Sequence, residues 1–173
     1  MASARKNLST YDASTLPDGA NMTIGIVVAD WNADITHALY EGCYDTLVKH
    51  GVETDRIHTV QVPGTFELPA AAKMLAAARR LDGVVCIGCV IKGETSHNEY
   101  INMSVAHALQ TLSVASGKPF IFGVLTPNDE QQAKDRAGGK YGNKGVEAAA
   151  TVLRMVGLKQ SLTAPKKAIG YGR

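Results

Sequence analysis

Four short apolar runs alternate with segments of helical spacing along this chain, and this alternation constrains the fold more than any other feature. The apolar runs span residues 22–29, 56–62, 83–90 and 120–125. Helical spacing of apolar residues follows over 34–50, 65–80 and 97–116, and again from 143 or 144 to 156. Short buried runs that alternate with helices are typical of parallel strands joined by right-handed crossovers. The order predicts an α/β fold of three layers, an αβα sandwich whose four-stranded parallel sheet has helices on both faces.

The length and composition indicate one domain. The chain has 173 residues, and 45% of them are apolar, which is enough for a normal core. We expect a folded domain over 22–158, a flexible N-terminal segment over 1–21 and a polar C-terminal tail over 159–173. The formal net charge of +2 is too small to indicate nucleic acid or an acidic membrane as a partner. No run is long enough to span a bilayer and no secretory signal is recognisable, so we expect a cytoplasmic protein.

Two cysteines, Cys86 and Cys89, have the C-x-x-C spacing of redox and zinc motifs. They lie inside an apolar run that is predicted to be a strand, where residues three apart point to opposite faces. A redox or zinc pair is therefore excluded here. We interpret both thiols as buried apolar side chains.

The junction between the third run and the third helix carries the strongest functional signal. Residues 88–100 read GCVIKGETSHNEY, a glycine-containing loop that leads from a strand into a helix. Ser96 and Glu99 fit a capping box at the start of this helix. Free backbone N–H groups at a helix start attract an anion, and His97 beside them supplies an imidazole, a common general acid/base group. This combination predicts chemistry on a phosphorylated molecule; the other four histidines lack such a context.

The other loops that follow predicted strands are also unusually polar or aromatic. They comprise Asp30–Asn32, Pro63–Glu67, Ile91–Thr95 and Thr126–Pro127. In open α/β sheets, ligands bind beyond the carboxyl ends of the strands, so we expect one pocket to use all of these loops. Pro127 is expected at the first position of a short helix that ends at Gly138–Gly139.

Two other motif matches fail. His97-Asn98-Glu99 matches the H-x-E of zinc deaminases, but no P-C-x-x-C follows it. The glycine-rich stretch 138–145 follows a helix rather than a strand and lacks G-K-S/T, so it is no P-loop.

Five collinear pieces of sequence, each weak alone, are specific together. They lie at residues 31–32, 62–69, 88–97, 121–126 and 135–145. Together they resemble the 6,7-dimethyl-8-ribityllumazine synthase family over residues 22–158. The resemblance implies a flavodoxin-like sheet and the condensation of 5-amino-6-(D-ribitylamino)uracil with 3,4-dihydroxy-2-butanone 4-phosphate, a transferase step of riboflavin biosynthesis. Phosphate and water are released, and the family needs neither a metal nor an organic cofactor.

The same resemblance assigns roles to individual residues. The catalytic proton shuttle is His97. The substrate-binding residues are Trp31, Asn32, Gly64, Thr65, Phe66, Glu67, Val90, Ile91, Lys92, Phe122 and Lys144. The phosphate-binding residues are Glu94, Thr95 and Arg136.

The chemistry of several of these side chains suits the assigned roles. An indole at Trp31 offers an aromatic face to a flat pyrimidinedione; many family members have phenylalanine there. Asn32 and Glu67 can accept hydrogen bonds from a ribityl chain. The guanidinium of Arg136 is a fork that matches phosphate oxygens. Lys144 would stand at a helix start, the unfavourable end for a cation, which favours a ligand beside it.

The resemblance also implies partners. These are further copies of the chain, in a pentamer or an icosahedral assembly of pentamers, with Phe122, Arg136 and Lys144 across a subunit boundary, and riboflavin synthase as a further candidate. The short turn over 138–144 favours a shell, and the N-terminal segment is a candidate to cover a neighbour's sheet edge. Two alternatives stay open: a non-catalytic shell protein that binds flavin or lumazine, and the archaeal type of riboflavin synthase, which ranks lower.

Overall fold

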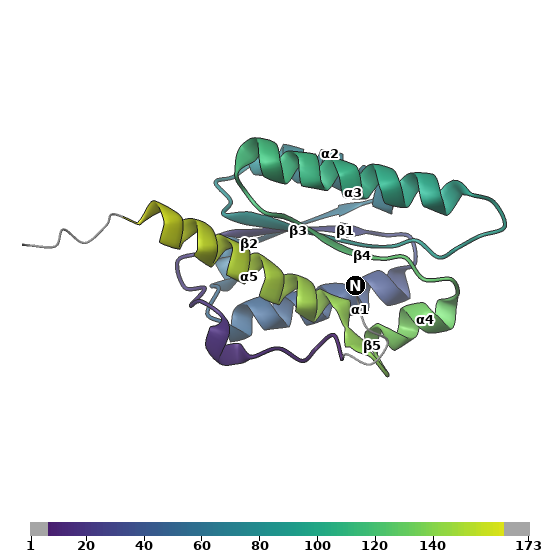
Figure 1. Cartoon of the computed structure of the whole chain (residues 1–173), viewed down its shortest axis with the longest axis horizontal. Helices are drawn as coiled ribbons and strands as arrows, with labels where there is room; N and C mark the ends of the chain where they lie inside the picture. The colour runs from purple at the N-terminus through teal and green to yellow at the C-terminus, as the bar shows by residue number, and fades with distance from the viewer. Residues whose placement is uncertain (1–6, 165–173) are drawn as a thin grey trace, which may run out of the picture.

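The central layer of the protein is a parallel sheet with the strand order β2-β1-β3-β4. The structure is a computed structural model that describes residues 7–164. The strands are β1 (Ile24–Ala29), β2 (Ile57–Val62), β3 (Gly83–Cys89) and β4 (Phe120–Leu125). β1 pairs with β2 and β3, and β3 pairs with β4, all in parallel. The predicted α/β fold with a four-stranded parallel sheet is therefore confirmed (Figure 1).

Burial of the strands follows their place in the sheet. Every residue of β1 and β3 is buried, because these central strands are covered on both faces. The edge strand β2 instead alternates between more and less buried residues. Continuous apolar runs are the expected pattern for central parallel strands, and this pattern is what made β1 and β3 recognisable in the sequence.

Helices cover both faces of the sheet (Figure 1). On one face, α1 (Ala33–Lys49) and α5 (Lys144–Thr163) pack Leu39, Leu47 and Leu153 against the strands. On the other face, α2 (Leu68–Ala78) and α3 (His97–Ser116) bury Leu68 and Leu109. Two apolar cores, one on each side of the sheet, therefore hold the strand ends in place.

The three cysteines Cys43, Cys86 and Cys89 are free and buried. Cys86 belongs to the core under α2 and α3, whereas Cys89 belongs to the core under α1 and α5, so the pair points to opposite faces. Burial raises the pKa of Cys43 to about 12 and that of Cys89 to about 11, so these thiols stay protonated. The interpretation as buried apolar side chains is confirmed.

The capping box predicted at the start of α3 is wrong. The Ser96 side chain makes no capping hydrogen bond, and its backbone (φ −72°, ψ 9°) departs from the extended conformation of most cap residues. Its carbonyl instead accepts from the Glu99 N–H at 3.0 Å. The sequence pattern was right about where the helix begins, because α3 starts at His97.

The region after β4 also differs from the prediction. α4 (Glu130–Asp135) starts three residues after Pro127, with Asp129 as its cap; the Asp129 side chain accepts from the Gln132 N–H at 2.8 Å. The helix ends before the two glycines. Ala137–Gly139 (β5) and Gly142–Asn143 (β6) then form a small antiparallel hairpin. Positive φ angles at Gly138 (111°) and Gly142 (80°) permit this tight reversal.

The structure describes part of each predicted end segment. α5 continues to Thr163, so residues 159–163 of the predicted tail are helical. Residues 7–21, predicted to be flexible, contact α1, α5 and the hairpin. Within this segment, the Tyr11 hydroxyl lies 2.8 Å from Nε2 of His50, and the Thr15 hydroxyl accepts from Arg154 at 2.8 Å. The remainder of both predicted segments, 1–6 and 165–173, lies outside the described residues.

Gly145 sets how closely α5 approaches α1. A β-carbon at this position would overlap the carbonyl oxygen of Leu39. We expect Gly145→Ala to lower the free energy of unfolding by about 1–3 kcal/mol, as overpacking does, measured by urea unfolding. Gly93→Ala is the control, because no atom lies within 4 Å of a β-carbon there. Equal stability of the two variants would contradict close packing at the α1–α5 crossing.

Candidate functional site

The loops that follow β1 and β2 are joined by backbone hydrogen bonds. The Asp30 N–H donates to the Val62 carbonyl at 2.8 Å, and the Trp31 N–H donates to the Pro63 carbonyl at 3.1 Å. Parallel strands end at the same edge of a sheet, so these bonds extend the β1–β2 pairing beyond it. Trp31 and the segment Gly64–Glu67 are thereby brought side by side.

Trp31 is exposed rather than part of the core. Its side chain has 65% of its surface accessible, and Phe66 nearby has 57%. A β-carbon at Gly64 would lie 2.8 Å from the Trp31 ring and 3.1 Å from a carboxylate oxygen of Glu67. Glycine at 64 therefore allows the indole to lie against the backbone, next to that carboxylate. The arrangement offers an aromatic face and a hydrogen-bond acceptor to the same ligand.

Asn32 connects the β1 loop to the end of β3. It adopts a left-handed backbone (φ 61°, ψ 47°) just before α1, and its side-chain N–H donates to the Cys89 carbonyl at 2.9 Å. Its side-chain oxygen makes no hydrogen bond within the described residues. Asn32 is thus an anchor for the loop as well as a candidate ligand acceptor.

Thr65 is buried, with only 4% of its surface accessible. A β-carbon at Gly88 would lie 2.6 Å from the Thr65 hydroxyl oxygen, so this side chain packs on the end of β3. Thr65 also begins a 3-10 turn, Thr65–Glu67, that leads into α2. The Thr65 hydroxyl is therefore buried, which leaves the backbone of Thr65 as the candidate ligand contact.

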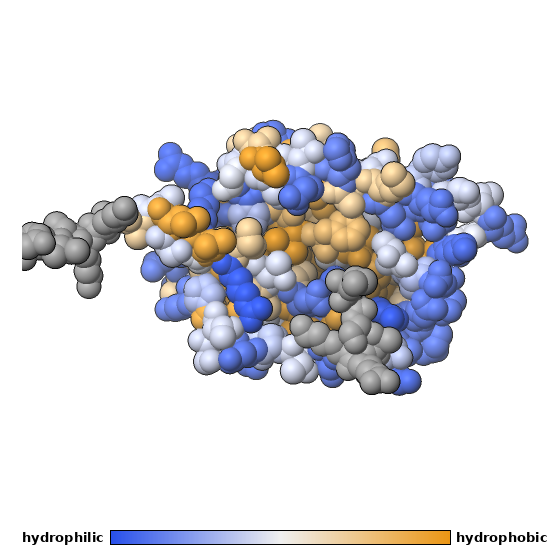
Figure 2. All heavy atoms as spheres, in the orientation of Figure 1, coloured by the Kyte–Doolittle hydropathy of each residue, from blue (hydrophilic) through white to orange (hydrophobic). Residues whose placement is uncertain are grey.

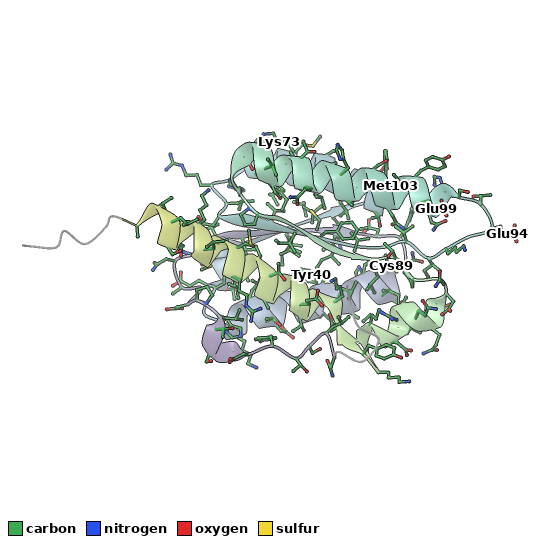
Figure 3. The ribbon with its side chains drawn as sticks, in the orientation of Figure 1. Tyr40, Lys73, Cys89, Glu94, Glu99 and Met103 are labelled. Carbon is green, nitrogen blue, oxygen red and sulfur yellow. The ribbon has the colours of Figure 1, made fainter. Side chains whose placement is uncertain are left out.

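The loop after β3 first follows β4 and then leaves the body of the protein. The Val90 N–H donates to the Leu125 carbonyl at 2.9 Å, and the Lys92 N–H donates to the Pro127 carbonyl at 3.0 Å. Residues 92–97 are exposed, and Glu94 lies at the outer tip of the loop (Figure 3). Within residues 7–164, the Glu94 and Thr95 N–H groups have no backbone acceptor, so both can donate to an anion.

His97 is the first residue of α3 and is exposed. It lies two residues after Thr95 and three after Glu94, so a candidate acid/base side chain and candidate anion donors belong to one short segment. Two features nearby were not expected from the sequence. The side-chain oxygens of Asn98 and Asn102, one turn apart on α3, are buried and lack a hydrogen-bond partner within the described residues.

Arg136 and Lys144 flank the hairpin, one directly before β5 and the other directly after β6. The Arg136 side chain donates to the Gln132 carbonyl at 3.1 Å, and its guanidinium lies 4.9 Å from the centre of the Tyr141 ring. The Lys144 ammonium forms an ion pair with Glu147 in the first turn of α5. The sequence argument for a ligand beside Lys144 is therefore corrected. The Glu147 carboxylate offsets the unfavourable interaction of the Lys144 cation with the helix start, so no ligand is needed to explain a cation there.

Phe122 and Lys144 line an apolar groove of about 860 Å³ that is separate from the loops. The groove lies between α3 and α5 and over the edge strand β4. Other lining residues include Leu109, Val114, Met155, Leu158 and Leu162. Figure 2 shows this apolar surface between the two helices.

The structure thus places the predicted site residues in two groups. Trp31, Asn32, Gly64–Glu67 and the 90–97 loop gather at the carboxyl ends of the strands. Phe122, Arg136 and Lys144 lie along β4, the hairpin and the start of α5. The partners Tyr141 and Glu147 were missed by sequence reasoning, although the i, i+3 spacing of Lys144 and Glu147 on a helix was a readable signal.

The described part of the chain has neither a metal-binding cluster nor a membrane-crossing helix. Between residues 7 and 164, no cluster of three or more His, Cys, Asp or Glu side chains is arranged to hold a metal ion. None of the helices in that range combines the length and apolar character that crossing a bilayer requires.

A parallel sheet with aromatic, acidic and imidazole side chains beyond its strand ends defines the class: an α/β protein with a ligand site at the carboxyl edge of the sheet. The sequence model of the 6,7-dimethyl-8-ribityllumazine synthase family matches residues 21–160. The chain belongs to this family.

Curated relatives of the same name align with nearly the whole chain. The 6,7-dimethyl-8-ribityllumazine synthase of Parabacteroides distasonis is 50% identical over 156 residues, which cover 90% of this chain and 98% of the relative. That of Porphyromonas gingivalis is 49% identical over 160 residues, covering 92% and 99%. That of Cytophaga hutchinsonii is 49% identical over 156 residues, covering 90% and 98%.

Proposed function

We infer that this chain condenses 5-amino-6-(D-ribitylamino)uracil with 3,4-dihydroxy-2-butanone 4-phosphate to 6,7-dimethyl-8-ribityllumazine in riboflavin biosynthesis. The family match over residues 21–160 carries this conclusion, and relatives about 50% identical bear the name of the enzyme. The test is turnover with both substrates present, followed by phosphate release and by the absorbance of the lumazine.

The geometry suits a reaction that depends on holding two molecules together. The uracil amine attacks the ketone carbonyl, water leaves as the imine forms, phosphate is eliminated, and ring closure releases a second water. Placing the reactants in contact supplies several kcal/mol of such a barrier. Trp31 and Glu67 lie together on the uracil side, while His97 follows the free Glu94 and Thr95 N–H groups on the phosphate side. His97 is then the group that moves protons during imine formation and phosphate loss.

The proposed assembly completes this site from a second copy. Phe122 and Lys144 lie in the α3–α5 groove, outside the loop cluster that holds Trp31 and Glu67. The exposed side chains of Trp31 and Phe66 suit the apolar groove of a neighbouring copy. Because the two surfaces differ, the contact is heterologous, and a heterologous contact forms a ring when the rotation between successive copies closes. We propose a pentameric ring, and a shell of such rings because the 138–144 turn is short.

Two further expectations belong to this proposal. Riboflavin synthase is a candidate partner, because it would consume the lumazine product. The proposed compartment is the cytoplasm, because a charged phosphate ester does not cross a bilayer unaided.

Trp31 is expected to stack on flat ligands, including the product and riboflavin. Its indole is exposed at the site and already lies against the Gly64 backbone. Binding should quench flavin fluorescence, and Trp31→Ala should weaken binding by about 1–3 kcal/mol if base-stacking energies transfer. Trp31→Phe serves as the control, since it keeps an aromatic face. Full quenching by the Trp31→Ala variant would place the ligand elsewhere.

Arg136 is expected to bind the phosphate of the four-carbon substrate. A charge-assisted hydrogen bond contributes about 1.5–3 kcal/mol, so Arg136→Ala should raise the KM for this substrate by ~10-fold or more. The KM for the ribitylaminouracil should change little, as measured in steady-state kinetics. Arg80→Ala, a change to an exposed arginine after α2, is the matched control. Equal increases in both KM values would indicate a damaged fold or assembly instead.

A further inference from the structure

Residues 7–9 contact the turn and the second strand of the hairpin, directly before α5. The Leu8 N–H donates to the Tyr141 carbonyl at 2.7 Å, and the Asn143 N–H donates to the Ser9 hydroxyl at 2.9 Å. The Leu8 side chain is buried. A β-carbon at Gly142 would overlap the Asn7 side-chain oxygen and lie 2.7 Å from the Ser9 nitrogen. Two segments more than 130 positions apart in the sequence are therefore in direct contact; we call residues 7–9 the N-terminal clasp.

Asn143 connects this clasp to both helices on that face of the sheet. Its side-chain N–H donates to the Ala38 carbonyl in α1 at 2.8 Å, and its side-chain oxygen accepts from the Gly145 N–H at 2.8 Å as the cap of α5. A β-carbon at Gly42 would lie 2.6 Å from the same amide nitrogen. Asn143 therefore fixes where α5 begins relative to α1 and leaves little room for adjustment.

Hydrogen bonds join the stretch that the clasp contacts, 141–143, to the residues around Arg136 and Lys144. The Lys144 N–H donates to the Arg136 carbonyl at 2.9 Å, and the Tyr141 N–H donates to the Asp135 carbonyl at 2.7 Å. The Tyr141 ring also lies beneath the Arg136 guanidinium. A shift of Tyr141 or Asn143 would therefore move Arg136 and Lys144 together. The uracil side does not depend on these contacts, because Trp31 and Glu67 are held by the β1 and β2 loops.

We propose that Ser9 and Asn143 are positioning residues and that the N-terminal clasp sets the places of Arg136 and Lys144. This proposal rests on the proposed function, since it assigns the clasp to the phosphate side of that site. The clasp itself touches no substrate. Its effect is selective: it controls binding of the phosphate ester and not of the ribitylaminouracil.

The test compares Ser9→Ala with Ser9→Thr, which keeps the hydroxyl, and with Thr10→Ala, a neighbouring exposed residue whose side chain makes no hydrogen bond in the described structure. Loss of one neutral hydrogen bond corresponds to a change of about 2- to 10-fold. We expect Ser9→Ala to raise by that factor both the KM for the phosphate ester and the inhibition constant of inorganic phosphate. Turnover at saturation and the KM for the ribitylaminouracil should stay within about twofold of the wild-type values, a smaller change than the loss of one hydrogen bond produces.

Asn143→Asp is the stronger variant, because it keeps the acceptor for Gly145 but loses the donor to Ala38. If it fails to fold, the Ser9 series still decides the question. The proposal would be overturned if Ser9→Ala raised both KM values equally or changed neither. It would also be overturned if Thr10→Ala produced the same change as Ser9→Ala. If the wild-type chain shows no condensation, the proposed function fails separately, and calorimetric titration of each variant with inorganic phosphate still tests the clasp.

Discussion

His97→Ala is expected to lower turnover by about 10²-fold while the KM of both substrates stays within a small factor. General acid/base groups typically supply ~10²–10⁴-fold, and the low end applies because an amine and an α-hydroxyketone react readily once they are held together. His97 opens α3 beside the free Glu94 and Thr95 N–H groups, so its removal deletes a proton carrier and leaves the anion donors in place. The measurement is steady-state kinetics with both substrates varied.

His107→Ala is the matched control, an exposed histidine further along the same helix. It should keep wild-type turnover. If His97→Ala also turns over at the wild-type rate, His97 has no part in the mechanism, and positioning of the two substrates is the whole of the catalysis.

Val114→Glu is expected to abolish both assembly and activity. Val114 lines the apolar groove, and 74% of its surface is exposed in the single chain, so a glutamate there costs little in a monomer. In a subunit contact the same carboxylate would be buried without a partner, at a cost of several kcal/mol. Light scattering after size exclusion should show the mass fall to that of one chain, with loss of lumazine formation.

Val48→Glu is the matched control, because Val48 is an exposed valine on α1 that lies outside the groove. It should assemble and turn over normally. A Val114→Glu monomer with full activity would contradict a site shared between copies.

A mixing experiment tests whether two defective variants restore activity when they assemble together. Subunits that carry His97→Ala and subunits that carry Arg136→Ala are refolded together in equal amounts. In a heterologous ring, about a quarter of the boundaries then join an intact His97 to an intact Arg136. With the phosphate ester held well below its wild-type KM, where Arg136→Ala alone is slowed by about 10-fold, activity above that of either variant alone is the expected result, whereas a site within one chain gives only the mean of the two variants.

The sequence predicted the parts of the fold that depend on local patterns. Runs of buried residues located β1 and β3 because central parallel strands are apolar throughout. Helical spacing and the strand-to-helix junction located the start of α3 at His97. The same order of elements implied that Trp31 and Glu67 would meet, since parallel strands end at one edge of the sheet.

The features that sequence reasoning missed depend on geometry between distant segments. The hairpin over 137–143 requires positive φ angles at Gly138 and Gly142. Glycines after a helix are equally typical of a simple loop, so the local sequence did not distinguish a loop from a hairpin. The contact of Ser9 with Asn143 joins residues that no periodicity relates. The capping box failed because the backbone of Ser96 is not extended and its side chain makes no capping hydrogen bond, and local sequence spacing does not report the backbone conformation.

Incubation of the wild-type protein with both substrates tests the central claim most directly. Phosphate release and lumazine absorbance are followed together, with each substrate also supplied alone. Condensation predicts that phosphate and lumazine appear in equal amounts, only when both substrates are present, and that His97→Ala slows both signals by the same factor. Flavin or lumazine binding at Trp31 without release of phosphate would contradict this account and would assign the chain to non-catalytic binding.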